Sequence, residues 1–92
     1  MFFFGKVKVN TENLPEFGHK LFNNELQRNH VKFSFCLKNN PAIGLNIWEA
    51  ESRAELEKIL LTYKPYFLEI IEIKELITPK ESFEFLMKEA QV

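Results

Sequence analysis

Residues 31–56, VKFSFCLKNNPAIGLNIWEAESRAEL, decide the fold class of this chain. Within them, Val31–Lys38 alternates between apolar and polar side chains, which is the period of a half-buried β-strand. Residues 39–41, Asn-Asn-Pro, are typical of a tight turn, and Ala42–Ala50 then alternates again. The segment therefore predicts two antiparallel strands joined by a hairpin.

A helix and a fourth strand are predicted after the hairpin. Ser52-Arg53-Ala54-Glu55 is a capping box, in which a serine and a glutamate three residues later satisfy free N–H groups at a helix start. An apolar stripe at helical spacing follows: Leu56, Ile59, Leu60 and Tyr63. Lys64-Pro65 ends this helix. Tyr66–Ile77 is apolar and rich in isoleucine, which favours an extended strand.

The N-terminal part repeats the strand–helix pattern. Phe2–Val9 alternates with period two and predicts the first strand. A helix is expected from about Leu14 to Gln27, with Asn13 as its N-cap. Gly18 inside it costs about 1 kcal/mol relative to Ala, which close packing on a sheet would offset.

The predicted order is strand–helix–strand–strand–helix–strand, followed by a terminal helix that the capping signal Thr78-Pro79-Lys80-Glu81 starts. This order indicates an α+β, ferredoxin-like βαββαβ fold with an antiparallel sheet and two helices on one face. Right-handed crossovers give the strand order 4-1-3-2. We expect residues 1–77 to form this domain and residues 78–92 to form a C-terminal helix that packs on the domain or on a partner subunit.

The sheet face away from the helices decides the expected oligomeric state. If the more apolar rows, led by Ile43, Leu45 and Ile47, pack on the helices, the open face carries Phe2, Phe4, Lys6, Lys8, Ser34, Cys36, Asn46 and Trp48. The fourth strand adds either Phe67, Ile71 and Ile73 or Leu68, Ile70 and Leu76. Such a patch is too apolar for a small monomer. A homodimer is therefore expected, with two sheets stacked through their open faces and Trp48 at the seam.

Composition excludes several classes of protein. The chain has 92 residues, enough for one domain, and its formal net charge of −1 disfavours a nucleic-acid partner. The same topology serves RNA recognition, but the third strand lacks the basic, doubly aromatic pattern. One cysteine cannot form an internal disulfide, which fits a cytoplasmic setting. No apolar run reaches the roughly 20 residues of a membrane span, and residues 5–8, Gly-Lys-Val-Lys, end the first apolar run too early for a signal peptide. We expect no membrane partner.

Residues 44–82 resemble the dimeric α/β-barrel superfamily, and within it muconolactone-isomerase-like proteins and related uncharacterised domains. Four segments carry the resemblance: Gly44–Ala50, Ser52–Leu56, Pro65–Ile70 and Thr78–Ser82. The resemblance implies a dimeric α/β barrel. Because the superfamily includes cofactor-free monooxygenases and isomerases, it also implies a possible activity on small aromatic or lactone substrates. No catalytic motif of the family stands in register here, so no catalytic set is transferred.

The candidate ligand-binding residues are Asn46, Trp48, Tyr63 and Tyr66. Large rings with one polar tip suit the wall of a small-molecule cleft. The alternative is that these rings plug the ends of the barrel and the dimer seam.

The weak catalytic candidates are His30, Glu72 and Tyr66, because they are groups that can transfer protons. His19, Cys36, Glu49 and Glu51 fit ordinary structural roles better. The two histidines are not spaced for a shared metal, so we expect no metal and no cofactor.

Two functions remain open from the sequence. In the first, the chain is a small dimer that binds a small, mostly apolar molecule in the cleft between sheet and helices. In the second, it is a cofactor-independent isomerase or monooxygenase that acts on small aromatic or lactone substrates. Two titratable groups converging in an enclosed pocket would favour the enzyme.

Overall fold

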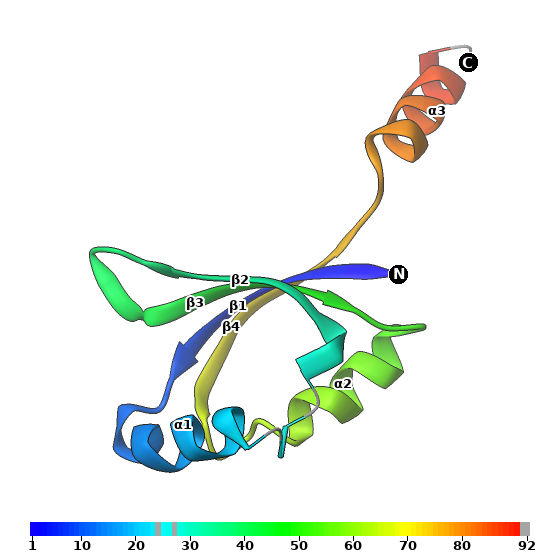
Figure 1. Cartoon of the computed structure of the whole chain (residues 1–92). Helices are drawn as coiled ribbons and strands as arrows, with labels where there is room; N and C mark the ends of the chain where they lie inside the picture. The colour runs from blue at the N-terminus through cyan, green and yellow to red at the C-terminus, as the bar shows by residue number, and fades with distance from the viewer. Residues whose placement is uncertain (24, 27, 91–92) are drawn as a thin grey trace.

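The computed structural model describes residues 1–23, 25–26 and 28–90, which form one curved sheet with helices (Figure 1). The elements along the chain are β1 (Phe2–Val9), the 3₁₀ turn η1 (Thr11–Asn13), α1 (Leu14–Phe22), the 3₁₀ turn η2 (Arg28–His30), β2 (Val31–Leu37), β3 (Asn40–Glu49), α2 (Arg53–Leu61), β4 (Phe67–Leu76) and α3 (Pro79–Ala90).

The sheet has the predicted topology. Its four strands lie in the order β2-β3-β1-β4, and each neighbouring pair is antiparallel. Both α1 and α2 cover the concave face (Figure 1), so the opposite face carries no helix of the main body. The α+β, ferredoxin-like βαββαβ fold expected from the sequence is confirmed.

The end of α1 and the turn of the hairpin are among the predicted boundaries that differ from the structure. Helix α1 ends at Phe22, well before Gln27, and Gln27 itself lies outside the described residues. In the hairpin, Leu37 is paired with Asn40, so the turn is shorter than the predicted Asn39–Pro41. Pro41 belongs to β3 but lies beyond the last pair that β3 makes with β1, where a missing N–H costs no ladder bond to that strand.

The capping predictions hold at two of the three helices. The Ser52 hydroxyl accepts from the Glu55 N–H at 3.1 Å, and the Thr78 hydroxyl accepts from the Glu81 N–H at 3.1 Å. Asn13 occupies the N-cap position of α1 as predicted, but its side chain makes no cap bond and donates instead to the Pro65 carbonyl at 2.7 Å. This bond ties the start of α1 to the loop before β4.

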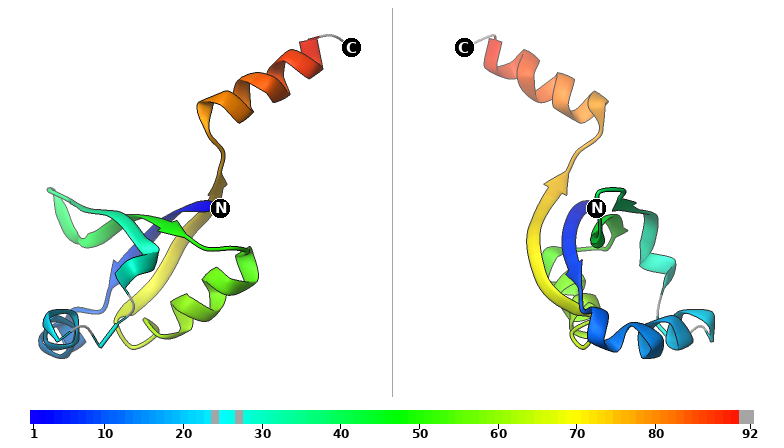
Figure 2. Two further views of the ribbon diagram at one scale, coloured as in Figure 1. Left: turned by 45° about the vertical axis from the view of Figure 1, so that its right-hand side comes forward. Right: turned by 90° about the vertical axis from the view of Figure 1, so that its left-hand side faces the viewer.

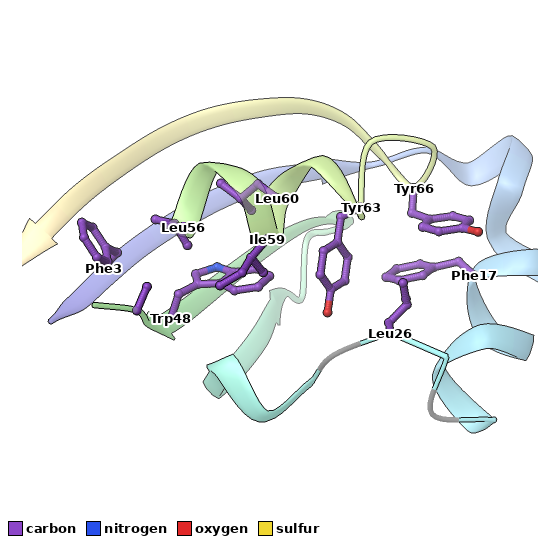
Figure 3. Packing of buried hydrophobic residues seen from close by; sticks show 10 residues of the cluster. Phe3, Phe17, Leu26, Trp48, Leu56, Ile59, Leu60, Tyr63 and Tyr66 are labelled. Carbon is purple, nitrogen blue, oxygen red and sulfur yellow. The ribbon is translucent and has the colours of Figure 1, made fainter. Parts of the chain in front are cut away.

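The core lies between the concave face of the sheet and helix α2 (Figure 3). The predicted stripe is buried as expected, with Leu56, Ile59 and Leu60 on α2 and Tyr63 in the turn after its end. Trp48 from β3 enters the same layer and meets the Tyr63 ring edge-on, with ring centroids 5.3 Å apart. Tyr63 in turn stacks on Phe67 at 5.0 Å. Aromatic side chains therefore hold β3, the turn after α2 and β4 together.

The predicted assignment of sheet faces is wrong for β2 and β3. Trp48 lies opposite Phe3, and both are almost fully buried under α2. Since residues two apart share a face, Asn46 and its partner Ser34 also face the helices, as does Cys36, which is paired with Gly44. Trp48 therefore does not lie at a seam between two sheets.

The glycine at position 5 explains why the row of β3 that contains Trp48 faces the helices. An ideal Cβ on Gly5 would stand 3.0 Å from Nε1 of Trp48, so the indole occupies the space that a side chain would need. The apolar area that Trp48 buries outweighs the area that the smaller apolar residues on the other row of β3 would bury. Ile43, Leu45 and Ile47 consequently lie on the convex face, where Ile43 is nevertheless buried.

The open, convex face is therefore apolar over β2 and β3, whereas β1 and β4 present both apolar and charged side chains there. Phe2, Phe4, Lys6 and Lys8 face outward as predicted, and Phe33 and Phe35 join them, paired with Ile47 and Leu45. Neither of the two sets of β4 residues predicted for the open face lies there as a whole. Phe67 and Ile73 pack against the core, while Ile70 is paired with the buried Val7. A register shift between Lys6 and Val7 moves part of the β4 row to the other face.

Helix α3 projects away from the rest of the molecule (Figures 1 and 2). None of its residues is buried, although four large apolar side chains stand on it: Phe83, Phe85, Leu86 and Met87. Among the described residues, no helix is long and apolar enough to cross a membrane.

Candidate functional site

A cleft opens between helix α1 and the concave face of the sheet. Its outer part has a volume of about 380 Å³ and lies between α1 and the strand ends next to the β2–β3 hairpin. Its described lining is Val9, Thr11, Leu14, Phe17, Gly18, Leu21, Cys36, Pro41 and Ala42. This volume alone falls in the range of about 300–1,000 Å³ that is typical of small-molecule sites.

The inner part has a volume of about 180 Å³ and reaches the middle of the sheet. It is lined by Val7, Val9, Phe17, Leu21, Arg28, Ser34, Cys36, Gly44, Asn46 and Phe67. The two parts share Val9, Phe17, Leu21 and Cys36, so they are adjacent sections of one space. We call this space the α1–sheet cleft.

Among the described lining residues, the polar groups lie at the inner part of the cleft, apart from Thr11 at the outer rim. The Ser34 hydroxyl donates to Oδ1 of Asn46 at 2.7 Å, which leaves the Asn46 amide nitrogen as a donor beside the cleft. Arg28 approaches the Tyr63 hydroxyl at 3.5 Å. The inner cleft is therefore rich in hydrogen-bond donors, whereas the outer cleft is apolar.

Two glycines shape the walls. A Cβ on Gly18 would meet no atom within 4 Å, so this residue leaves the α1 wall open and is not packed closely on the sheet. The expected offset of its helix cost by close packing is therefore wrong. A Cβ on Gly44 would stand 3.3 Å from Val7 and 3.9 Å from the Asn46 amide nitrogen, so Gly44 forms the floor of the inner part.

The structure separates the four predicted ligand-binding residues. Asn46 lines the inner cleft, while Trp48, Tyr63 and Tyr66 are almost fully buried in the core. Tyr66 stacks on Phe17 at 5.0 Å and forms the support behind the cleft wall.

The polar tip of Tyr66 turns away from the cleft. Its hydroxyl donates to Glu16 at 3.0 Å, on the outside of α1. Hydrogen bonding with the Tyr66 hydroxyl is the main cause that raises the pKa of Lys20, and the Glu16 carboxylate raises it by less. Tyr66 therefore takes part in a surface network rather than in the cleft.

The catalytic candidates do not converge. Nδ1 of His30 lies 3.0 Å from the Glu49 carbonyl and 4.0 Å from Glu55, in a separate cavity of about 270 Å³. Glu72 stands on the open face, opposite Lys6, and pairs with Lys74 at 2.8 Å. This carboxylate raises the pKa of Lys74. Among the described residues, no cluster of three or more His, Cys, Asp or Glu side chains could hold a metal ion.

A second apolar groove runs along α2 and the start of β4, with a volume of about 410 Å³. Its charged side chains are Glu57, Lys64 and Glu69, and both signs of charge are present. No set of like polar groups converges there, in contrast to the inner cleft.

Comparison with known proteins gives one similar structure. No protein-family model matches the sequence, and no curated protein matches it. A solved structure from Chloroflexus aurantiacus J-10-fl, described as an antibiotic biosynthesis monooxygenase, is similar with a TM-score of 0.45 and 11% identity. The match covers 84% of this chain and 90% of that chain. The fold assignment rests on the strand order and register of the chain itself.

Sequence reasoning missed most of the cleft. Gly18 was noted only for its helix cost, although a glycine between Phe17 and Leu21 on the core side of a helix is a signal for an open wall. Arg28 received no role. It is one of two arginines in the chain, and it lies just before β2, which pairs with β3.

Proposed function

We propose that this chain binds a small, mostly apolar molecule in the α1–sheet cleft. The observation that carries the proposal is the continuity of the apolar outer cleft with the donor-rich inner cleft. Apolar walls with a few converging polar groups are typical of small-molecule sites. Among the described residues that line the cleft, there is no histidine and no carboxylate, which favours binding over proton transfer.

A matched pair of variants at Gly18 tests the proposal. The probe is N-phenyl-1-naphthylamine, a neutral dye whose fluorescence rises in apolar surroundings. Gly18→Ala should bind the dye like the natural chain, because the added methyl group meets open space. Gly18→Phe should lose dye binding, because its ring enters the outer cleft.

The result that would contradict the proposal is equal dye binding by Gly18→Phe and Gly18→Ala. Circular dichroism and thermal unfolding confirm that both variants are folded. Both replacements have better helix propensity than glycine, so neither is expected to disrupt α1.

We further propose that the protein is a homodimer joined through the open sheet face. Phe33 and Phe35 support this proposal, since they are 62% and 67% exposed and stand beside the outward Leu45 and Ile47. Contiguous exposed apolar side chains of this kind mark interaction surfaces. Helix α3 adds a second unpartnered apolar surface, and we propose that it packs on the partner subunit.

The setting proposed for this dimer is the cytoplasm. Cys36 is exposed and is not part of a disulfide in the structure, which suits a reducing compartment.

A further inference from the structure

We infer that the molecule bound in the α1–sheet cleft carries a negatively charged or strongly hydrogen-bond-accepting head, such as a carboxylate, on an apolar ring or short chain. This inference rests on the proposed binding function and adds the class of ligand. It follows from the charge and from the hydrogen-bonding groups of the inner cleft.

Arg28 is the charged side chain among the described residues that line the cleft. A guanidinium group carries five N–H donors and no acceptor, and its planar shape matches a carboxylate. Among the described residues, no carboxylate forms an ion pair with Arg28. Its contact with the Tyr63 hydroxyl, at 3.5 Å, occupies one terminal nitrogen. Arg28 therefore retains donors for a ligand.

Asn46 adds to the same preference. Its side chain is 6% exposed, and its amide oxygen already accepts from Ser34. The remaining polar group is the NH₂, which donates and cannot accept. An acceptor group on the ligand satisfies both Arg28 and Asn46, whereas a cationic or donor group on the ligand satisfies neither.

The outer cleft determines the chemistry expected for the rest of the ligand. Its walls are apolar side chains from α1 and from the strand ends, so it fits a hydrocarbon ring or short chain. The carboxylate then lies at the inner end, next to Arg28, and the apolar body points toward Gly18 and Leu14. A small aromatic or aliphatic acid has this layout.

The test is displacement of the bound neutral dye by two molecules of similar shape, 1-naphthoate and 1-naphthalenemethanol. The natural chain should bind the acid at least about tenfold more tightly than the alcohol, as expected for a charge-assisted hydrogen bond. Arg28→Gln should lose this preference. Arg28→Lys should restore part of it, because it keeps the charge without the planar fork.

Arg53→Gln is the matched control. Arg53 stands on the surface of α2, with a side chain that is 56% exposed and pairs with Glu57 at 3.5 Å. Its replacement removes the same charge from the molecule but leaves the cleft unchanged. The preference for the acid should therefore persist in Arg53→Gln.

Four outcomes separate the possible failures. Equal binding of acid and alcohol by the natural chain, or a preference that survives in Arg28→Gln, would overturn the inference and leave the proposed function standing. Absence of dye binding by the natural chain would overturn both. Dye binding that disappears as the protein self-associates would show that a second copy fills the cleft, and this result also overturns the inference.

Discussion

At the residue scale, Gly5 and Trp48 fix which side of the sheet faces the helices. Gly5→Val should lower the free energy of unfolding by about 1–3 kcal/mol, since its side chain would press on the indole 3.0 Å away. Urea denaturation followed by Trp48 fluorescence measures the change. Unchanged stability of Gly5→Val would show that the indole is free to move and would contradict this packing.

Gly18 gives the opposite expectation at the same scale. Gly18→Ala should raise the free energy of unfolding by about 0.5–1 kcal/mol, because alanine restricts the unfolded chain and its methyl group meets no atom within 4 Å. The same urea experiment measures this gain. A loss of stability would mean that α1 packs more closely on the sheet than the structure shows.

At the element scale, the two capping boxes begin helices that contribute differently to the buried core. Ser52→Ala should lower the free energy of unfolding by about 1 kcal/mol, because α2 carries three buried residues of the core. Thr78→Ala removes the equivalent bond from α3, which has no buried residue. Its effect on unfolding should stay within about 0.5 kcal/mol when the chain is monomeric.

Equal destabilisation by the two variants, measured by urea denaturation at low protein concentration, would contradict the independence of α3. Thr78→Ala should instead lower the helix content seen by circular dichroism.

The elements themselves were largely predictable because their signals are local. Period-two alternation marked β1, β2 and β3, and isoleucine-rich composition marked β4. Ser52 and Thr78 marked the starts of α2 and α3. The number of apolar residues in each row did not predict which face of β2 and β3 turns toward the helices. This orientation depends on the contact between Gly5 and Trp48, which are 43 positions apart in the sequence.

The cleft was still less predictable, since its polar groups come from different elements. Arg28, Ser34 and Asn46 meet only once β2 and β3 are paired and α1 is in place. Asn46 was the one predicted ligand-binding residue that the structure places there. Trp48, Tyr63 and Tyr66 were chosen for their chemistry, but their size makes them core residues in so small a domain.

At the scale of the whole molecule, the open face predicts the oligomeric state. Phe35→Glu should convert the proposed dimer to a monomer, because it places a charge in the apolar half of the open face. Phe22→Glu is the control, since Phe22 is 91% exposed on α1, far from that face. Size-exclusion chromatography with light scattering distinguishes the two states.

A Phe35→Glu variant with the same mass in solution as Phe22→Glu would contradict assembly through this face. If both variants remain dimeric, the apolar side of α3 becomes the next surface to change, through Phe83→Ser and Leu86→Ser together.

The measurement that tests the central proposal most directly is a crystal structure of the protein grown with 1-naphthoate. The expected result is a naphthalene ring between α1 and the concave face of the sheet, with its carboxylate within hydrogen-bond distance of Arg28. A cleft closed by the side chains of α1, or naphthoate bound only on the open face, would contradict the proposed function.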